Sequence, residues 1–293
     1  MKKINLPSVL TIAGTDPSGG AGIQADIKTL SATGSYAASV ITALTAQNTQ
    51  GVQAIYEIPV DFFIQQLNAV FSDLTIDAVK IGMLHNEKII EALAVTLLKI
   101  KPNNIVLDPV MIAKNGCALL ASNTLPFLKK RLFPLVTIIT PNIAEAEMIS
   151  ERKIQQFSDM ESAAKTMGEE YGVDVLIKGG HLQTPKSSDV LYSLKDNKLF
   201  WFHADRIDSH NTHGTGCTLS SAIASYLAQG HSVQEAISLA KQYLTLALQA
   251  GKHLHIGHGC GPVHHFYFLG DKKYGIFTKG DVALSASDNQ TSF

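Results

Sequence analysis

The sequence is poor in cysteine, lacks a long apolar run and has no excess of charge of either sign. Its three cysteines, Cys117, Cys217 and Cys260, form no CxxC pair, which argues against a disulfide framework. No segment approaches the roughly 18 uninterrupted apolar residues of a membrane span. With 24 basic and 25 acidic residues, the chain lacks the basic excess typical of nucleic-acid-binding proteins. We therefore expect a reduced, cytoplasmic protein that binds neither nucleic acid nor membranes.

The composition and the residue patterns both indicate a folded α/β protein. Apolar residues make up 45% of the 293 residues and charged residues 17%, which excludes disorder for the bulk of the chain. Short β-branched runs alternate with segments of helical period, as in the α/β class. Strands are expected at 9–13, 40–46, 78–81, 105–107, 137–139 and 173–177, and helices at 23–33, 63–71, 89–97, after Gly216 and after a capping box of Ser232 and Glu235.

These elements predict a mostly parallel central sheet flanked by helices. Asp196-Asn197 lies between two β-rich runs and predicts a small hairpin at a sheet edge. We expect a single domain over 1–269. The polar segment 270–293 has no apolar period at its end, so we expect a peripheral tail there.

The first candidate site is the glycine-rich segment 14–22, between an expected strand and an expected helix. Backbone N–H groups there could face an anion or a polar ligand, although a simple strand-to-helix turn has the same composition. No Gly-Lys-Ser/Thr follows, so it is not a Walker A loop. Gly20, Gly22 and Ala25 fit a loose dinucleotide fingerprint, but Thr45 and Gln47 lie where an acidic residue is required.

The second candidate is 211–218, where Gly214, Thr215 and Gly216 precede a helix of small residues. Backbone amides at a helix start can hold a phosphoryl group. Cys217 would lie in the first turn, where the helix N-terminus is expected to raise its thiolate fraction, so it could act as a base. The alternative is a buried small residue in a tightly packed helix.

Two further groups have competing interpretations. Asp108, Asn142 and Glu145 follow expected strands and could arrange Mg²⁺, yet Asn142 and Glu145 also have the spacing of a helix capping box. A cluster near the C-terminal end has the composition of a zinc site but no regular ligand spacing, and polar or core histidines explain it better: His253, His255, His258, Cys260, His264 and His265.

Seven motifs, taken in order, resemble those of the hydroxymethylpyrimidine/phosphomethylpyrimidine kinases of thiamine biosynthesis, within the ribokinase-like superfamily. They lie at 10–26, 46–49, 80–84, 106–111, 140–145, 178–181 and 212–217. The resemblance covers about 7–266. It implies a ribokinase-like fold and transfer of the ATP γ-phosphoryl group to 4-amino-5-hydroxymethyl-2-methylpyrimidine, and then to the monophosphate. It also implies Mg²⁺ as cofactor and a homodimer.

The resemblance also implies roles for individual residues. Cys217 matches the base, where much of the superfamily has aspartate, and Gly214, Thr215 and Gly216 match the anion hole. The other matched positions are the pyrimidine pocket of Ala21, Asp26, Gln47, Met83 and Val110, the ATP-binding residues Lys178 and Asn142, and the metal residues Glu145 and Asp108.

Three expectations complete the interpretation. Asp26 and Gln47 should read the aminopyrimidine, because a carboxylate accepts from its NH₂ group and an amide both donates and accepts. The loop around Lys114 and Gly116 should close over the substrate. A pyridoxine/pyridoxal kinase and a catalytically silent pyrimidine-binding regulator remain alternatives, and ADP release that depends on substrate would separate an enzyme from a binder.

Overall fold

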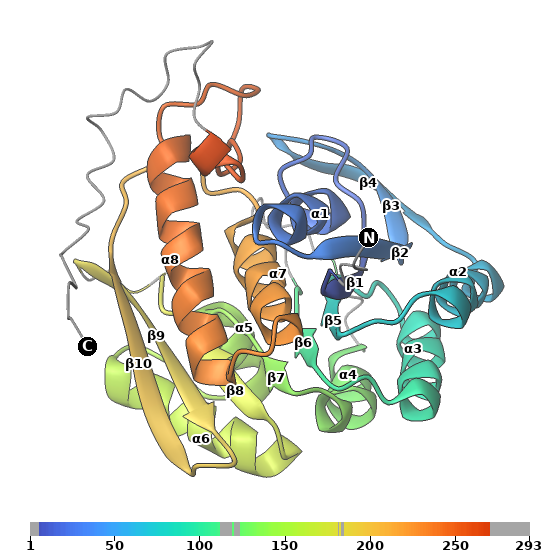
Figure 1. The fold of residues 1–293 in the computed structure, drawn as a ribbon. Helices are drawn as coiled ribbons and strands as arrows, with labels where there is room; N and C mark the ends of the chain where they lie inside the picture. The colour runs from blue at the N-terminus through green and yellow to red at the C-terminus, as the bar shows by residue number, and fades with distance from the viewer. Residues whose placement is uncertain (1–5, 112–118, 120–123, 181, 183–184, 270–293) are drawn as a thin grey trace, which may run out of the picture.

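A computed structural model describes residues 6–111, 119, 124–180, 182 and 185–269. Its centre is an eight-stranded sheet with the order β10-β9-β8-β7-β6-β5-β1-β2 (Figure 1). Six neighbouring strands of this sheet are parallel to one another: β8, β7, β6, β5, β1 and β2. Strand β9 runs antiparallel to both of its neighbours, β8 and β10. The strands are β1 (Ser8–Ala13), β2 (Tyr36–Ile41), β5 (Ala78–Ile81), β6 (Ile105–Leu107), β7 (Ile138–Ile139), β8 (Asp174–Ile177), β9 (Lys186–Ser193) and β10 (Lys198–Asp205).

Helices cover both faces of the sheet, giving three layers (Figure 1). On one face, α1 (Gly22–Ala32), α7 (Thr215–Ala228) and α8 (Val233–Gly251) pack on alternate strand residues such as Val9 and Val106. On the other, α2 (Val60–Asp73), α3 (Glu87–Ile100), α4 (Thr124–Arg131), α5 (Ile143–Ser150) and α6 (Phe157–Tyr171) pack on residues such as Leu10 and Leu107. Because both faces are buried, the central strands are mostly apolar, although β1 contains Thr11 and β5 contains Lys80.

A separate two-stranded antiparallel sheet of β3 (Ala43–Asn48) and β4 (Gly51–Glu57) corrects the sequence prediction. The expected strand at 40–46 is wrong, because β2 ends at Ile41 and β3 begins in another sheet at Ala43. Thr42 makes the break by donating its N–H to Ala13 O and its hydroxyl to Met83 O. The run around Thr42 contains no glycine or proline, so the sequence carries no turn signal there.

The remaining expected elements are close to those observed. The hairpin of β9 and β10 turns at Asp196 and Asn197 and lies at the sheet edge, as predicted. Ser232 and Glu235 form the predicted capping box at the start of α8. The α/β class with a mostly parallel sheet is confirmed. The tail at 270–293 lies outside the described residues, so the division into 1–269 and 270–293 stays a prediction. No helix in the described part of the chain is long and apolar enough to span a bilayer.

Candidate active site

Strand ends collect the candidate residues at one edge of the central sheet. Gly14 follows β1, Met83 follows β5, Asp108 follows β6, Asn142 follows β7 and Lys178 follows β8. Since the carboxyl ends of parallel strands share one edge, residues far apart in the sequence meet there. This edge therefore positions the site.

The first turn of α7 meets the glycine-rich loop 14–22. Gly214 is the N-cap of α7 with φ of +76°, and a Cβ on it would lie 1.8 Å from Gly20 O and 3.2 Å from Ala21 Cα. Only glycine accommodates both this backbone conformation and this approach. Gly22 N–H donates to the sulfur of Cys217. The structure thus brings the expected anion hole against the loop that contains Ala21.

A carboxylate and an imidazole join the same two loops. Asp16 is buried and accepts hydrogen bonds from the backbone N–H groups of Ser18, Gly20 and Ala21. His213 Nε2 lies 2.8 Å from Asp16 Oδ2. Burial alone would raise the pKa of Asp16, but the hydrogen bonds from His213 and Ser18 outweigh it and lower the pKa. Sequence reasoning assigned no role to this pair, although both residues lie within the quoted motifs.

Opposite charges lie beside the first turn of α7. Lys178 Nζ is 2.6 Å from Asp108 Oδ1, and both side chains are largely buried. A Cβ at Gly216 would begin 3.3 Å from Asp108 Oδ2 and 3.4 Å from Lys178 Nζ. Burial alone would lower the pKa of Lys178, but the carboxylates of Asp108 and Glu145 raise it. The ammonium of Lys178 therefore lies close to the N-terminus of α7, where backbone N–H groups have no partner within the helix. Such an arrangement suits the binding of a phosphoryl group.

Asn142 and Glu145 satisfy both of their sequence interpretations. Asn142 Oδ1 accepts from Glu145 N, and Glu145 Oε2 accepts from Asn142 N at 2.8 Å, which completes a capping box on α5. Glu145 is also buried near Lys178 and Asp108. Burial raises the pKa of Glu145 to about 7, and the charge of Asp108 adds to this, although Lys178 opposes it.

The donor set fits Mg²⁺ held partly by substrate phosphates. Within the described residues, no three His, Cys, Asp or Glu side chains converge on a point where a metal could sit. Asp108 and Glu145 supply two carboxylates, and one or two carboxylates with phosphate oxygens and water are the usual Mg²⁺ environment in phosphoryl-transfer enzymes. These residues could thus hold the ion together with ATP.

Replacing Glu145 with glutamine separates the capping role from the metal role. Glutamine retains an N3 acceptor, so the helix cap should largely survive while the Mg²⁺ concentration needed for half-maximal activity rises. A raised carboxyl pKa means that the folded wild type holds more protons than the unfolded chain between about pH 4.5 and 7, so its stability falls with rising pH. The variant should lack this fall. Unfolding midpoints across pH and Mg²⁺ titrations check both effects, and an unchanged titration with a lost cap would support capping alone.

A buried ion pair lies beneath the loop of the first helix. Asp26 and Lys80 are both 0% exposed, with 2.9 Å between Asp26 Oδ2 and Lys80 Nζ. Asp26 also accepts from the hydroxyls of Thr11 and Ser221. Burial alone would lower the pKa of Lys80, but Asp26 raises it. Its oxygens already accept from three donors, which leaves little acceptor capacity for the substrate amino group, so recognition of that group by Asp26 stays a prediction.

We expect Asp26→Asn to destabilise the protein by about 3–5 kcal/mol, because Lys80 would be left buried and uncompensated. Losses in kcat/KM should be parallel for the pyrimidine and for pyridoxal. The double variant Asp26→Asn/Lys80→Met is the matched control and should recover much of the stability. Urea unfolding and kinetics with both alcohols make the measurement. A loss confined to the pyrimidine would support direct recognition by Asp26.

The protonation of Cys217 depends on its burial and on nearby charges. Burial raises the pKa of the thiol to about 11; Lys80 lowers it and the carboxylates of Asp26 and Asp108 raise it further. This effect of burial opposes the rise in thiolate expected at the helix N-terminus. Cys217 lies in the first turn of α7, next to the expected anion-hole residues Thr215 and Gly216.

Two of the expected pyrimidine residues lie in a small apolar cluster, which we term the apolar wall, and a third lies beside His213. Met83 and Val110 pack in one small cluster with Val52 and Ile55 of the β3–β4 hairpin. The Gln47 side-chain nitrogen lies 3.4 Å from His213 Nε2. The hairpin's part in this wall was missed, because β4 was not recognised in the sequence. Lys114 and Gly116, expected to close over the site, lie outside the described residues.

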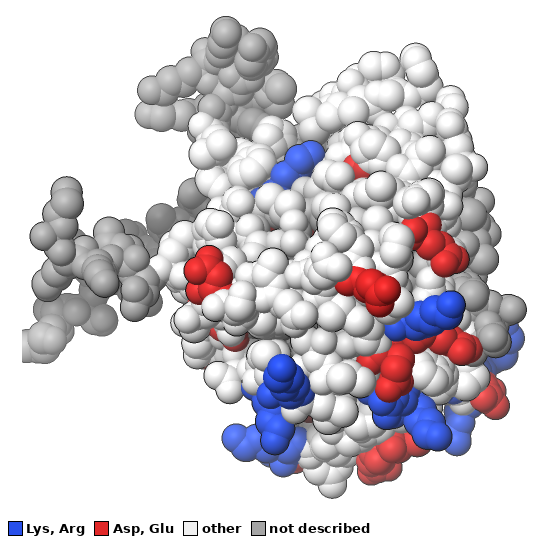
Figure 2. Space-filling model, turned by 90° about the vertical axis from the view of Figure 1, so that its right-hand side faces the viewer, with Lys and Arg blue, Asp and Glu red and all other residues white. Residues whose placement is uncertain are grey.

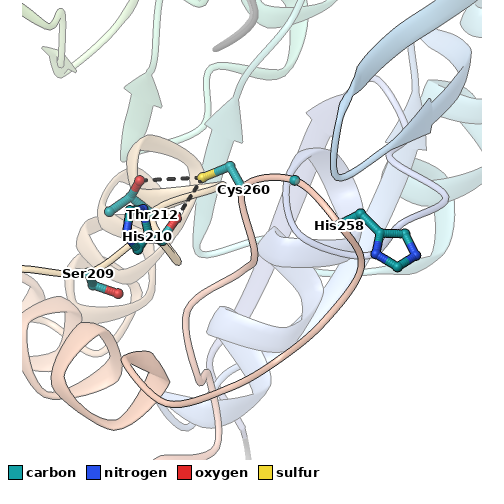
Figure 3. A pocket seen from close by; sticks show the side chains of 6 residues that line it. Ser209, His210, Thr212, His258 and Cys260 are labelled. Carbon is teal, nitrogen blue, oxygen red and sulfur yellow. Dashed lines mark hydrogen bonds between the residues drawn. The ribbon is translucent and has the colours of Figure 1, made fainter.

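A separate groove of about 520 Å³ borders the anion-hole segment (Figure 3). Cys260 Sγ donates to His210 O at 3.0 Å and lies 3.5 Å from Thr212 Oγ1, whereas His258 points away from them. Its lining is Ser209, His210, Thr212, His258, Gly259 and Cys260. His265, from the same histidine-rich segment, is buried, which lowers its pKa to about 4, and lies 3.2 Å from the Thr218 hydroxyl.

Comparisons with known proteins agree with this geometry. The family model described as phosphomethylpyrimidine kinase matches residues 16–264. A hydroxymethylpyrimidine/phosphomethylpyrimidine kinase of Escherichia coli is 48% identical over 91% of this chain and 99% of its own length. A thiamine biosynthesis bifunctional protein of Geobacter sulfurreducens is 49% identical over 88% of this chain, but the chain spans only 52% of that relative.

A solved structure resembles the chain closely. The ADP complex of Bacillus subtilis pyridoxal kinase has a TM-score of 0.83 and 36% sequence identity, covering 90% of this chain and 99% of that one. This agreement confirms the ribokinase-like fold expected from the motifs. The family match spans most of the residues that build the site, from Asp16 to His264. The chain therefore belongs to the phosphomethylpyrimidine kinase family.

Proposed function

We propose that the protein transfers the γ-phosphoryl group of ATP to 4-amino-5-hydroxymethyl-2-methylpyrimidine and then to the resulting monophosphate. One observation carries the proposal: Lys178 and Asp108 flank Gly216 in the first turn of α7, with Cys217 beside it. A cation and converging backbone amides suit a phosphoryl group, and the cysteine supplies a nearby proton acceptor. The printed names of the relatives support the substrate class.

The residues divide the chemistry among them. The apolar wall of Met83 and Val110 holds the pyrimidine ring, and Gln47 can donate to a ring nitrogen or accept from the amino group. Cys217, as the thiolate, takes the proton of the substrate hydroxyl as that oxygen attacks the γ-phosphorus, and ADP leaves as the bond from this phosphorus to the bridging oxygen breaks. The amides of Thr215 and Gly216 stabilise charge on the phosphoryl oxygens.

A second group of residues would bind ATP and its metal ion. Lys178 and Asn142 lie next to each other on adjacent strand ends, and we assign them to the nucleotide phosphates. Bound Mg²⁺, held through Glu145 and Asp108, would supply charge neutralisation for phosphoryl transfer. The ADP complex of the pyridoxal kinase supports ATP as co-substrate.

A coupled ADP-release assay tests the proposal with three acceptors: the pyrimidine alcohol, its monophosphate and pyridoxal. We expect release with the first two and much weaker release with pyridoxal. Preferred release with pyridoxal would instead support a pyridoxal kinase, which the similarity to such a structure keeps as a second candidate. Pyrimidine binding without any release would support a regulator.

The proposal extends to a homodimer in the cytoplasm. Leu44 and Tyr56 are paired across the outward face of the β3–β4 hairpin and are 41% and 64% exposed. Figure 2 shows the side of the molecule that carries this hairpin, and charged side chains are sparse in its upper part. Such a face suits a second copy of the chain. Light scattering should give twice the monomer mass, and Tyr56→Asp should lower it.

A further inference from the structure

A buried ion pair outside the catalytic groups touches the loop that carries Lys178. Asp189 in β9 and Lys241 in α8 are 4% and 7% exposed, and Lys241 Nζ lies 2.6 Å from Asp189 Oδ2. The other carboxylate oxygen, Oδ1, accepts a hydrogen bond from Gly179 N at 2.9 Å. One carboxylate thus joins α8 to the residue that follows Lys178.

The backbone around Gly179 leaves little freedom. A Cβ on Gly179 would lie 2.0 Å from Ser188 O, so the loop runs directly against β9. Lys178 N–H donates to Pro141 O on the other side. Arg206 donates to Gly180 O and Leu182 O just beyond. The Asp189 bond therefore fixes the point where the chain leaves β8, from which the Lys178 side chain departs.

Lys241 neutralises the charge of Asp189, which matters for a carboxylate close to bound nucleotide phosphates. A carboxylate is a stronger acceptor for a backbone N–H than a neutral group, so it holds the loop more firmly. An uncompensated carboxylate this close to Lys178 would repel a nucleotide. Lys241 cancels that charge, and the pair can serve the loop without weakening anion binding.

We propose that Asp189, neutralised by Lys241, is a positioning residue that sets the Lys178–Gly179 backbone so that the Lys178 ammonium meets the ATP phosphates. This inference rests on the proposed kinase function. It assigns no contact between Asp189 and the substrates; Asp189 acts through Lys178.

Removing the bond to Gly179 should weaken nucleotide binding selectively. We expect Asp189→Leu to raise the KM for ATP and the Kd for ADP by roughly 10-fold or more, the worth of a hydrogen bond to a charged group, and to change the KM for the pyrimidine less than about 2-fold. The double variant Asp189→Asn/Lys241→Met keeps an oxygen for Gly179 and removes both charges. It should restore ATP binding to near the wild-type value.

Asp174, in the neighbouring strand β8, offers a control for the loss of a carboxylate. Its carboxylate accepts from Leu194 N at the opposite end of β8 from Lys178. Asp174→Leu also removes a bond from a backbone N–H to a carboxylate, and it should leave the KM for ATP unchanged. Urea unfolding curves of every variant identify conditions under which each protein is fully folded. Kinetics measured under those conditions do not reflect a loss of stability.

A double-mutant cycle with Lys178→Ala decides the route of the effect. If Asp189 acts through Lys178, Asp189→Leu should cause no further rise in the Kd for ADP in the Lys178→Ala background. An equal rise in both backgrounds, or equal rises for ATP and pyrimidine, would overturn the inference. Calorimetric titration of the wild type and of Asp189→Leu with ADP separates failure of this inference from failure of the proposed function. If Asp189→Leu binds ADP as tightly as the wild type, this inference alone is overturned. If the wild type binds no ADP, the proposed function is overturned as well.

Discussion

Replacing Cys217 with alanine should lower kcat by about 10²- to 10⁴-fold, the usual contribution of a general base, with little change in pyrimidine binding. The sulfur lies in the first turn of α7 and accepts a hydrogen bond from Gly22 N, so alanine removes the acceptor without disturbing the helix. Steady-state kinetics and calorimetric titration with the pyrimidine alcohol measure the two effects. Near-normal turnover would exclude Cys217 as the base.

The pH dependence gives a second test of the same role. With a thiol pKa of about 11, Cys217 is protonated at neutral pH, and a base must lose its proton before it can accept another. The wild-type kcat/KM should therefore rise with pH between about 7 and 9. Cys217→Asp is the matched control, because the ordinary pKa of a carboxyl group lies several units below that of a thiol. It should retain activity and lose the alkaline rise, and a flat wild-type profile would contradict this assignment.

Gly216→Val should cause a still larger loss, with turnover below detection and a raised KM for ATP. The valine Cβ would begin 3.3 Å from Asp108 Oδ2 and 3.4 Å from Lys178 Nζ, and its two methyl groups would occupy the space assigned to the phosphoryl group. The backbone amides would then lose their approach to that group.

Gly216→Ala provides a graded control for the valine variant. A single Cβ requires its neighbours to shift by only a few tenths of an ångström, so the alanine variant should keep more activity. Circular dichroism and thermal unfolding show whether both proteins fold. Turnover by Gly216→Val within tenfold of wild type would place the phosphoryl group elsewhere.

Local patterns in the sequence were sufficient for most of the sheet. The mostly apolar runs at 78–81 and 105–107 match β5 and β6 residue for residue, because parallel strands buried on both faces are rich in apolar residues. The same signal failed at Thr42, where an unbroken β-rich run passes from one sheet to another. Strand identity there depends on hydrogen bonds to Ala13 and Met83, which a local window does not contain.

The resemblance to the kinase family selected Asp108, Lys178 and Gly216, and two strand ends and the first turn of α7 bring these residues together. The surroundings of Asp26 and Cys217 could not be predicted in the same way, because burial and partners such as Lys80 determine them. Those partners come from distant segments. Lys80 alone offered a signal, since a charged residue within an apolar strand needs a buried counter-charge.

The β3–β4 hairpin stands apart from the central sheet, yet it supplies Val52 and Ile55 to the apolar wall and places Gln47 beside His213. The phosphoryl-transfer groups, in contrast, are rooted in the sheet and in α7. Under the proposed function, part of the acceptor site would thus lie in an element that the transfer groups do not depend on. A lineage could then exchange residues of the hairpin and change its preference for an alcohol while the groups at Gly216 stay intact.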